Sequence, residues 1–209
     1  MGSRLLALDI GTKLGMCMAL EGEVVEILTW HVKTKTTEDL PDHERWRRLY
    51  KLIEDRVSLY GITDLAFELV NHATIRGGRQ AQLYWGAVSI VQLVAAQHGL
   101  KLHPIPVGTV KMTLAGKGNA KKDEMLTAAR SKTKFSIVDD NSADALGVAL
   151  CALKMLTADG ETKNVDRIDR KSGSRKVGGR KAPSPRTQPK ASSVCRSAQA
   201  RTHPLGRSV

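Results

Sequence analysis

Residues 4–13 read Arg-Leu-Leu-Ala-Leu-Asp-Ile-Gly-Thr-Lys, and the rest of the predicted fold is built around them. The apolar run is typical of a buried strand, which ends at Asp9 before the chain breaks at Gly11. Because glycine has no Cβ, another backbone, a phosphate or a metal ion can approach closely there. An isolated Asp-x-Gly is more often an acid that hydrogen-bonds its own turn. The stretch therefore predicts a strand that presents one carboxylate at its end.

Acids in two later segments strengthen the prediction of a site. A second apolar run, residues 65–70, contains Glu68. If this strand lies parallel beside the first, Asp9 and Glu68 emerge at neighbouring positions on the sheet. Asp140 and Asp144 are four residues apart and share one face at the start of an apolar helix. Four carboxylates packed together repel one another unless a cation lies among them, so we predict a site for Mg²⁺, or alternatively Mn²⁺, that supports phosphodiester hydrolysis.

The remaining pattern predicts a mixed α/β sheet with helices on both faces. A hairpin turn at residues 21–23 makes the opening a three-stranded antiparallel meander. Strand–helix–strand crossovers then add two parallel strands. The expected strands are residues 4–9, 15–20, 24–32, 65–70 and 101–105. The expected helices are residues 43–60, 80–98, a short turn or helix within 107–118, a helix capped by Asn119 that ends near Lys132, and a last helix from Ser142 to about Leu156.

The positive charge is concentrated at the C-terminal end of the chain. The 209 residues contain 33 Lys and Arg against 21 Asp and Glu, a net charge of +12. Residues 160–209 alone carry a net charge of +10 and contain few apolar residues. Such a segment cannot bury enough surface to offset its ordering entropy. We therefore predict one folded domain, residues 1–158, and a disordered basic tail, residues 159–209, that adds sequence-independent affinity for nucleic acid.

The cysteines and the hydropathy pattern predict a soluble cytoplasmic protein. The three cysteines are odd in number and show no paired spacing, so neither a disulfide framework nor a zinc site is expected. The first residues lack the pattern of a signal peptide. The most apolar helix is too short to span a bilayer, so no membrane partner is expected.

Several of these segments together resemble the RuvC family of Holliday-junction resolvases, which are RNase H-like nucleases, and its phage-type members most of all. The resemblance rests on residues 8–12, the later strand ending in Glu68, and residues 140–146. Residues 116–122 also resemble the glycine-bracketed basic segment of that family. The likeness covers about residues 4–156, in order and with sensible spacing.

The resemblance implies a five-stranded RNase H-like domain that acts as a homodimer. It implies binding to a four-way DNA junction and symmetric, magnesium-dependent nicks. The metal ligands that it implies are Asp9, Glu68 and Asp144. Many members place an acid or a histidine three residues before the last Asp, where this chain has Asn141, so Asp140 is the alternative fourth ligand. Asp139 is expected to cap the helix instead.

Basic residues near these acids are expected to contact DNA without reading its sequence. The residues expected to contact phosphates near the cut are Lys111, Lys117, Lys121 and Lys122. Arg76 and Arg79, in the loop after Glu68, are expected to contact the junction. Relatives often have an aromatic wedge in this loop, whereas here it contains His72 and Ile75 and no aromatic residue other than histidine.

Three other functions fit parts of the sequence. An actin-like or sugar-kinase ATPase also begins its phosphate site with Asp-Ile-Gly-Thr, but it needs a second such motif, which this chain lacks. A related RNase H-like nuclease could act on other branched DNA or on RNA with the same acids. A basic nucleic-acid-binding protein without catalysis would fit if Asn141 meant that the metal site had decayed.

Overall fold

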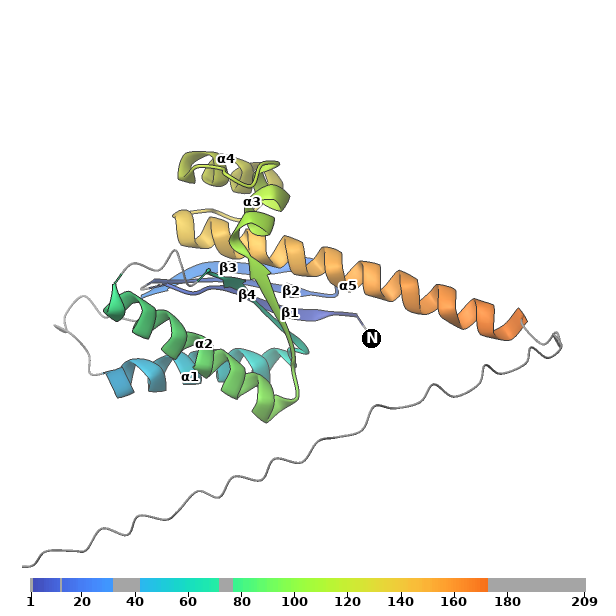
Figure 1. Ribbon diagram of the computed structural model, residues 1–209, viewed down its shortest axis with the longest axis horizontal. Coiled ribbons are helices and arrows are strands. Elements are labelled where there is room, and N and C mark those ends of the chain that lie inside the picture. The colour runs from blue at the N-terminus through green and yellow to red at the C-terminus, as the bar shows by residue number, and fades with distance from the viewer. Residues whose placement is uncertain (1, 12, 32–41, 72–76, 173–209) are drawn as a thin grey trace, which may run out of the picture. The chain divides into compact units, whose positions relative to one another are not determined.

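The computed structural model describes residues 2–11, 13–31, 42–71 and 77–172 (Figure 1). The strands are β1 (Arg4–Asp9), β2 (Lys13–Leu20), β3 (Glu23–His31), β4 (Asp64–Leu69) and β5 (Lys101–Pro106). The helices are α1 (Asp42–Tyr60), α2 (Gly78–His98), α3 (Val107–Ala115), α4 (Lys122–Lys132) and α5 (Asp140–Ser172). No helix in the described part of the chain is both long and apolar enough to cross a membrane.

The five strands form one mixed sheet in the order β3-β2-β1-β4-β5. The first three strands pair antiparallel, and β4 and β5 add parallel to β1. The hairpin between β2 and β3 turns at Glu21 and Gly22, whose φ angles are 54° and 88°. Positive φ at both central residues is the turn that matches the twist of paired strands. The predicted meander and the two parallel strands are confirmed.

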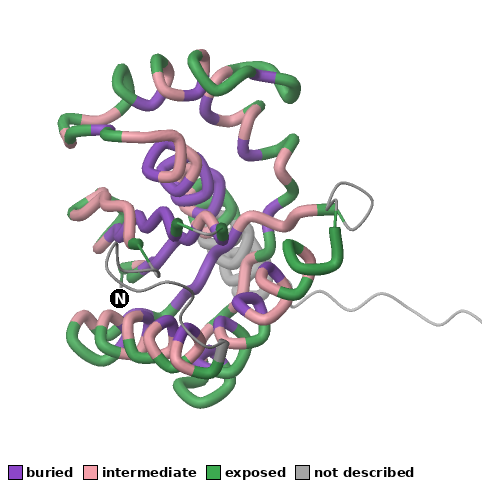
Figure 2. The backbone as a smooth tube through the Cα atoms, turned by 90° about the vertical axis from the view of Figure 1, so that its left-hand side faces the viewer, coloured by how far each residue is buried: buried purple, intermediate pink, exposed green. Residues whose placement is uncertain are grey.

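The sheet separates two apolar cores, because alternate residues of a strand point to opposite faces. Leu6 and Leu8 of β1 pack with α1 and α2 on one face. Leu5 and Ala7 pack with α3, α4 and α5 on the other. Figure 1 shows these helices on the two sides of the sheet, and Figure 2 shows buried residues gathered along the strands and on the inward sides of the helices. The predicted layers with helices on both faces are thus confirmed.

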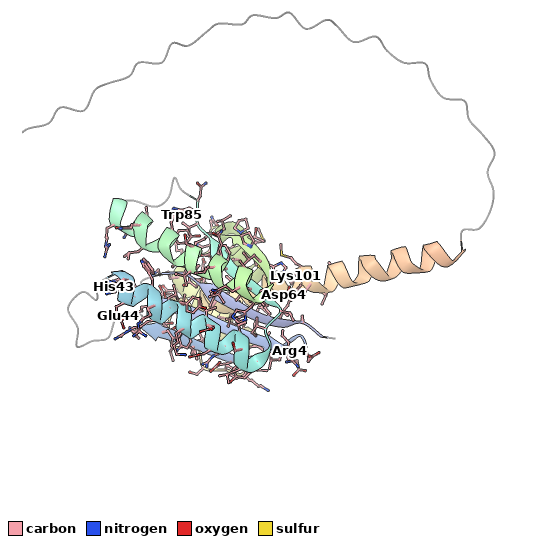
Figure 3. The ribbon with its side chains drawn as sticks, turned by 90° about the horizontal axis from the view of Figure 1, so that it is seen from below. Arg4, His43, Glu44, Asp64, Trp85 and Lys101 are labelled. Atoms are coloured by element: carbon pink, nitrogen blue, oxygen red, sulfur yellow. The ribbon has the colours of Figure 1, made fainter. Side chains whose placement is uncertain are left out.

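The strands β1, β4 and β5 all begin at one end of the sheet. Figure 3 shows Arg4, Asp64 and Lys101 near this end, with His43 and Glu44 at the opposite end of α1. Buried Asp64 accepts a hydrogen bond from Thr63 Oγ1 at 2.7 Å and pairs with Nε2 of His103 at 2.8 Å. These polar contacts tie the starts of β4 and β5 together. The parallel strands therefore end together at the far edge, where β1 presents Asp9.

Two predicted helix boundaries were wrong. The first residue of α4 is Lys122 and its N-cap is Lys121 rather than Asn119. The Glu124 carboxylate accepts a hydrogen bond from the Lys121 N–H at 2.7 Å, which satisfies the start of the helix without an asparagine cap.

The last helix, α5, continues to Ser172 instead of ending near Leu156. Extending an existing helix needs no new nucleus, so a polar sequence can continue it. Residues 160–172 are therefore helical where composition predicted disorder. The compact unit is Met1–Lys171. The rest of the predicted tail, residues 173–209, lies outside the described residues, and the domain boundary at residue 158 stays a prediction.

Candidate active site

Strands β1 and β4 place two of the predicted acids side by side. Their parallel register pairs Leu8 with Phe67, so the next residues along the two strands, Asp9 and Glu68, are neighbours. Both acids lie two residues after positions that face α3, α4 and α5, namely Ala7 and Ala66. The two carboxylates therefore lie on the same face of the sheet, at the edge where β1 and β4 end.

The start of α5 approaches this edge through a backbone contact that depends on Gly15. Gly15 pairs with Asp9 in the sheet register. A Cβ added to Gly15 would lie 2.0 Å from the carbonyl oxygen of Asn141, far closer than two non-bonded heavy atoms can approach. Glycine therefore allows the first turn of α5 to lie directly on β2. This contact brings Asp140 and Asp144 over the end of β1.

Asp139 fastens the same helix end to the sheet. Its Oδ1 accepts a hydrogen bond from the Ser142 N–H at 3.0 Å, which is an N-cap contact, and another from Thr29 Oγ1 at 2.6 Å. Thr29 lies on β3 and pairs with Gly15. The expected capping role of Asp139 is confirmed. The contact to Thr29 was not anticipated, because no sequence pattern links residues 110 positions apart.

A second close helix contact brings Lys111 toward the acids. A Cβ on Gly147 of α5 would lie 2.7 Å from Cγ1 of Val110, so α3 packs tightly on α5. Lys111 follows Val110 in α3. Its positive charge acts on both Glu68 and Asp144 and lowers the pKa of each. Lys111 is thus one of the predicted DNA contacts that the structure brings to the acids.

The carboxylates of the two strands have raised pKa values. The pKa of Asp9 is well above its ordinary value, first because burial disfavours the charged form and then because Glu68, Asp144, Asp140 and Asp139 add negative charge. The pKa of Glu68 is raised to about 7 by burial and by the charge of Asp144. These shifts show that acids from three separate elements act electrostatically on one another.

The acids of α5 behave differently from each other. Burial, followed by the charge of Asp140, raises the pKa of Asp144 to about 6. The pKa of Asp140 is instead lowered, mainly because Lys122 donates a hydrogen bond to its Oδ2. Asn141 Nδ2 lies 3.3 Å from Asp139 Oδ2 and 3.5 Å from Asp140 Oδ1. In this arrangement the positive charge beside Asp140 comes from Lys122.

The remaining predicted DNA contacts have other partners or lie outside the described residues. Lys117 forms an ion pair with Glu124. Lys121 is the N-cap residue of α4. Arg79, in the first turn of α2, donates a hydrogen bond to Gln82 Oε1 at 3.0 Å. Arg76 and the loop residues His72 and Ile75 lie outside the described residues.

The donor set suits a hard divalent cation. All four predicted ligands are carboxylates, and hard cations such as Mg²⁺ take oxygen ligands. Within the described residues, no three His, Cys, Asp or Glu side chains are already spaced to hold one ion. The pKa values of Asp9, Glu68 and Asp144 are raised first by burial and then by neighbouring acids, and a bound cation would stabilise their charged forms. The assignment of these residues as ligands stays a prediction.

Tyr84 of α2 is a further residue that the sequence analysis missed. Its hydroxyl donates a hydrogen bond to the main-chain oxygen of Glu68 at 3.0 Å and accepts one from the Val70 N–H at 3.0 Å. In the sequence, Tyr84 is one of several large residues in an apolar helix, so nothing distinguishes it from a core residue.

The stability of the metal-free protein is expected to fall as the pH rises from about 4.5 to about 7. In this window folded Glu68, with a pKa raised from 4.5 to about 7, keeps a proton that the unfolded chain releases. Unfolding then releases protons, so higher pH favours the unfolded state. Asp144 acts in the same direction up to about pH 6. Because one pKa unit corresponds to about 1.4 kcal/mol, the shifts of the two acids together correspond to about 6 kcal/mol at most.

Thermal unfolding in EDTA at several pH values measures this effect. Glu68→Gln should be less sensitive to pH than the wild type, and the difference between the two isolates this acid from all other titrating groups. Equal slopes for the two proteins would contradict the prediction.

Known proteins share this fold. Residues 7–152 match the family model of the crossover junction endodeoxyribonuclease RuvC. The structure of Thermus thermophilus RuvC is similar, with a TM-score of 0.60 at 24% identity over 74% of this chain and 96% of that one. T. thermophilus RuvC in complex with Holliday junction substrate gives 0.60 at 25% identity over 71% and 92% of the two chains.

The yeast mitochondrial Holliday junction resolvase Ydc2 shares the fold at 13% identity, with a TM-score of 0.52 over 72% of this chain and 78% of that one. The match to the family model spans well over half of the sequence. It includes Asp9, Glu68, Asp140 and Asp144, which the fold gathers at one edge of the sheet. The chain therefore belongs to the RuvC family of crossover junction endodeoxyribonucleases.

Proposed function

We propose that this protein resolves four-way DNA junctions by divalent-metal-dependent hydrolysis, as a homodimer that makes paired symmetric nicks. The observation that carries the proposal is the convergence of four acids from β1, β4 and α5, seen in the electrostatic effects of the other three on Asp9. A related protein, T. thermophilus RuvC, has a structure in complex with a Holliday junction substrate. The cytoplasm is the proposed site of action.

Asp9, Glu68, Asp140 and Asp144 would hold the divalent ions, with Mg²⁺ as the proposed ion and Mn²⁺ as the alternative. When bound, such ions activate a water molecule and stabilise the leaving oxygen of an in-line displacement at phosphorus. Asp140 is the proposed fourth ligand rather than Asn141, because its charge already acts on Asp9 and Asp144. Substrate and ion would have to displace Lys122 from Asp140.

Lysines at the same edge would hold the DNA backbone. Lys111 and Lys122 act electrostatically on the acids. A DNA phosphate bound by these two lysines would therefore lie next to the proposed metal ligands. Lys117 and Lys121, on the segment leading into α4, would extend this contact along one strand. Other residues proposed to contact the junction are Arg76 and Arg79.

The second subunit would pack against α2. Its inward side carries Val88, Val91 and Val94 into the core. Its outer side still presents apolar area, since Leu93 is 47% exposed. Leu93 is the large apolar side chain of α2 that stays exposed among the described residues, so it is the proposed centre of that contact.

The decisive experiment compares matched four-way, Y-shaped and linear duplex DNA, each with Mg²⁺ and with EDTA. Paired nicks in the four-way substrate that require Mg²⁺ are the expected result. Equal cutting of the Y-shaped substrate would indicate a nuclease for branched DNA in general. Cutting in EDTA would overturn the metal-dependent mechanism, and no cutting under any condition would favour a non-catalytic binding protein.

The basic tail is expected to supply sequence-independent affinity. Nine Lys and Arg and no acids follow Lys171. Deletion of residues 160–209 should weaken junction binding and flatten its dependence on salt, because fewer counterions are released. Cleavage at low salt should survive, since all four proposed ligands remain. Binding isotherms over a range of salt concentrations measure the slope, and an unchanged slope would contradict the prediction.

A further inference from the structure

The hydroxyl of Tyr84 lies at the point where β4 no longer pairs with β1. The pairing of β1 with β4 ends at Leu8 and Phe67. Immediately beyond it, the Tyr84 hydroxyl donates to the main-chain oxygen of Glu68 and accepts from the N–H of Val70, both at 3.0 Å. One side chain thus supplies the donor and the acceptor that another residue of a paired strand would supply. The strand keeps its extended course through Glu68.

The ring of Tyr84 is held firmly by its surroundings. Tyr84 is only 8% exposed and belongs to the apolar core between the sheet and α2. Its ring packs edge-on against Trp85, with 5.0 Å between the ring centres. A phenylalanine would fill this space equally well, so packing alone does not require the hydroxyl. The polar atom in this core therefore serves the peptide groups of β4.

We propose that Tyr84 is a positioning residue that sets the direction of the Glu68 carboxylate toward the metal-binding edge. The inference rests on the proposed role of Glu68 as a ligand. Glu68 is the residue whose main-chain oxygen is held, so its Cα and the origin of its side chain are fixed by the same bond. Partners that orient a ligand typically affect metal affinity or activity by about 10- to 100-fold.

Tyr84→Phe removes the hydroxyl and keeps the ring. We expect the dissociation constant for Mn²⁺, measured calorimetrically without DNA, to rise about tenfold. The Mg²⁺ concentration that half-saturates cleavage should rise by a similar factor, while junction binding in EDTA stays unchanged. A role confined to stability would lower the unfolding temperature and leave the Mn²⁺ affinity unchanged, and that result would overturn the proposal.

A matched control is Tyr50→Phe, which removes a hydroxyl that donates to Gln97 Oε1 at 2.9 Å on the exposed surface of α1 and α2. This variant should bind Mn²⁺ as the wild type does. The titrations of Tyr84→Phe and Tyr50→Phe are made at low temperature so that modest destabilisation does not affect them. If Tyr84→Phe is too unstable for calorimetry, thermal unfolding with and without Mn²⁺ replaces it, because an ion that binds the folded state raises the unfolding temperature. A rise as large as that of the wild type would overturn the proposal, and a smaller rise would support it. Wild-type protein that neither binds Mn²⁺ nor cleaves would overturn the proposed function itself.

Discussion

Replacement of Gly15 by alanine is expected to reduce the rate of junction cleavage by about 100-fold or more, because a misplacement of about 1 Å in an active site has an effect of that size. The added Cβ would lie 2.0 Å from the carbonyl oxygen of Asn141 and 2.6 Å from its carbonyl carbon. Both are backbone atoms, so the start of α5 must move away from β2. Asp140 and Asp144 move with it, and the four acids separate.

Single-turnover nicking with Mg²⁺ measures this loss, and junction binding in EDTA should change little because the lysines remain. Gly108→Ala is the matched control, since a Cβ on Gly108 meets nothing within 4 Å. It should cleave at the wild-type rate. Full activity in Gly15→Ala would show that the contact between β2 and α5 does not determine the geometry of the acids.

Asp9→Asn is expected to have two effects of opposite sign. Loss of one metal ligand removes several kcal/mol of transition-state stabilisation, which corresponds to a rate about a thousandfold lower. The metal-free variant should nevertheless unfold at a higher temperature than the wild type at neutral pH. Burial and the neighbouring acids raise the pKa of Asp9, so its ionised form destabilises the folded state. An amide of the same shape removes that charge.

Cleavage assays with Mg²⁺ and thermal unfolding in EDTA test the two effects separately. Asp55→Asn is the control, because Asp55 lies on the surface of α1 and pairs with Lys51 at 3.0 Å. It should cleave normally and should not gain stability. Unchanged cleavage in Asp9→Asn would contradict the enzymatic proposal, and lowered stability would contradict the electrostatic interpretation of the acids.

Local sequence patterns were sufficient to predict the strands and the helix that carry the four acids. Apolar runs that end in an acid gave the positions of Asp9 and Glu68 correctly, because a buried strand must be apolar and a carboxylate interrupts it. The spacing of Asp140 and Asp144 placed both on the first turn and a half of α5. Even the cap at Asp139 followed from its position before an apolar helix.

Contacts between distant segments could not be predicted in the same way. Gly15 is an ordinary strand residue in the sequence, and its close contact with Asn141 depends on how α5 docks. The Thr29 and Tyr84 hydroxyls likewise have partners chosen by packing rather than by spacing. The cap predicted at Asn119 was wrong because Glu124 satisfies the Lys121 N–H instead. The acids of the site could thus be predicted from the sequence. The residues that hold these acids in place could be identified only from the tertiary structure.

The distribution of the acids along the polypeptide has a consequence for biosynthesis. Translation proceeds from the N-terminus, and a nascent chain that stops before residue 140 contains only Asp9 and Glu68 of the four. The other two arrive on the last helix of the compact unit and reach the sheet only when that helix docks. Incomplete products of the ribosome therefore lack two of the four proposed metal ligands, and we expect them not to cleave DNA.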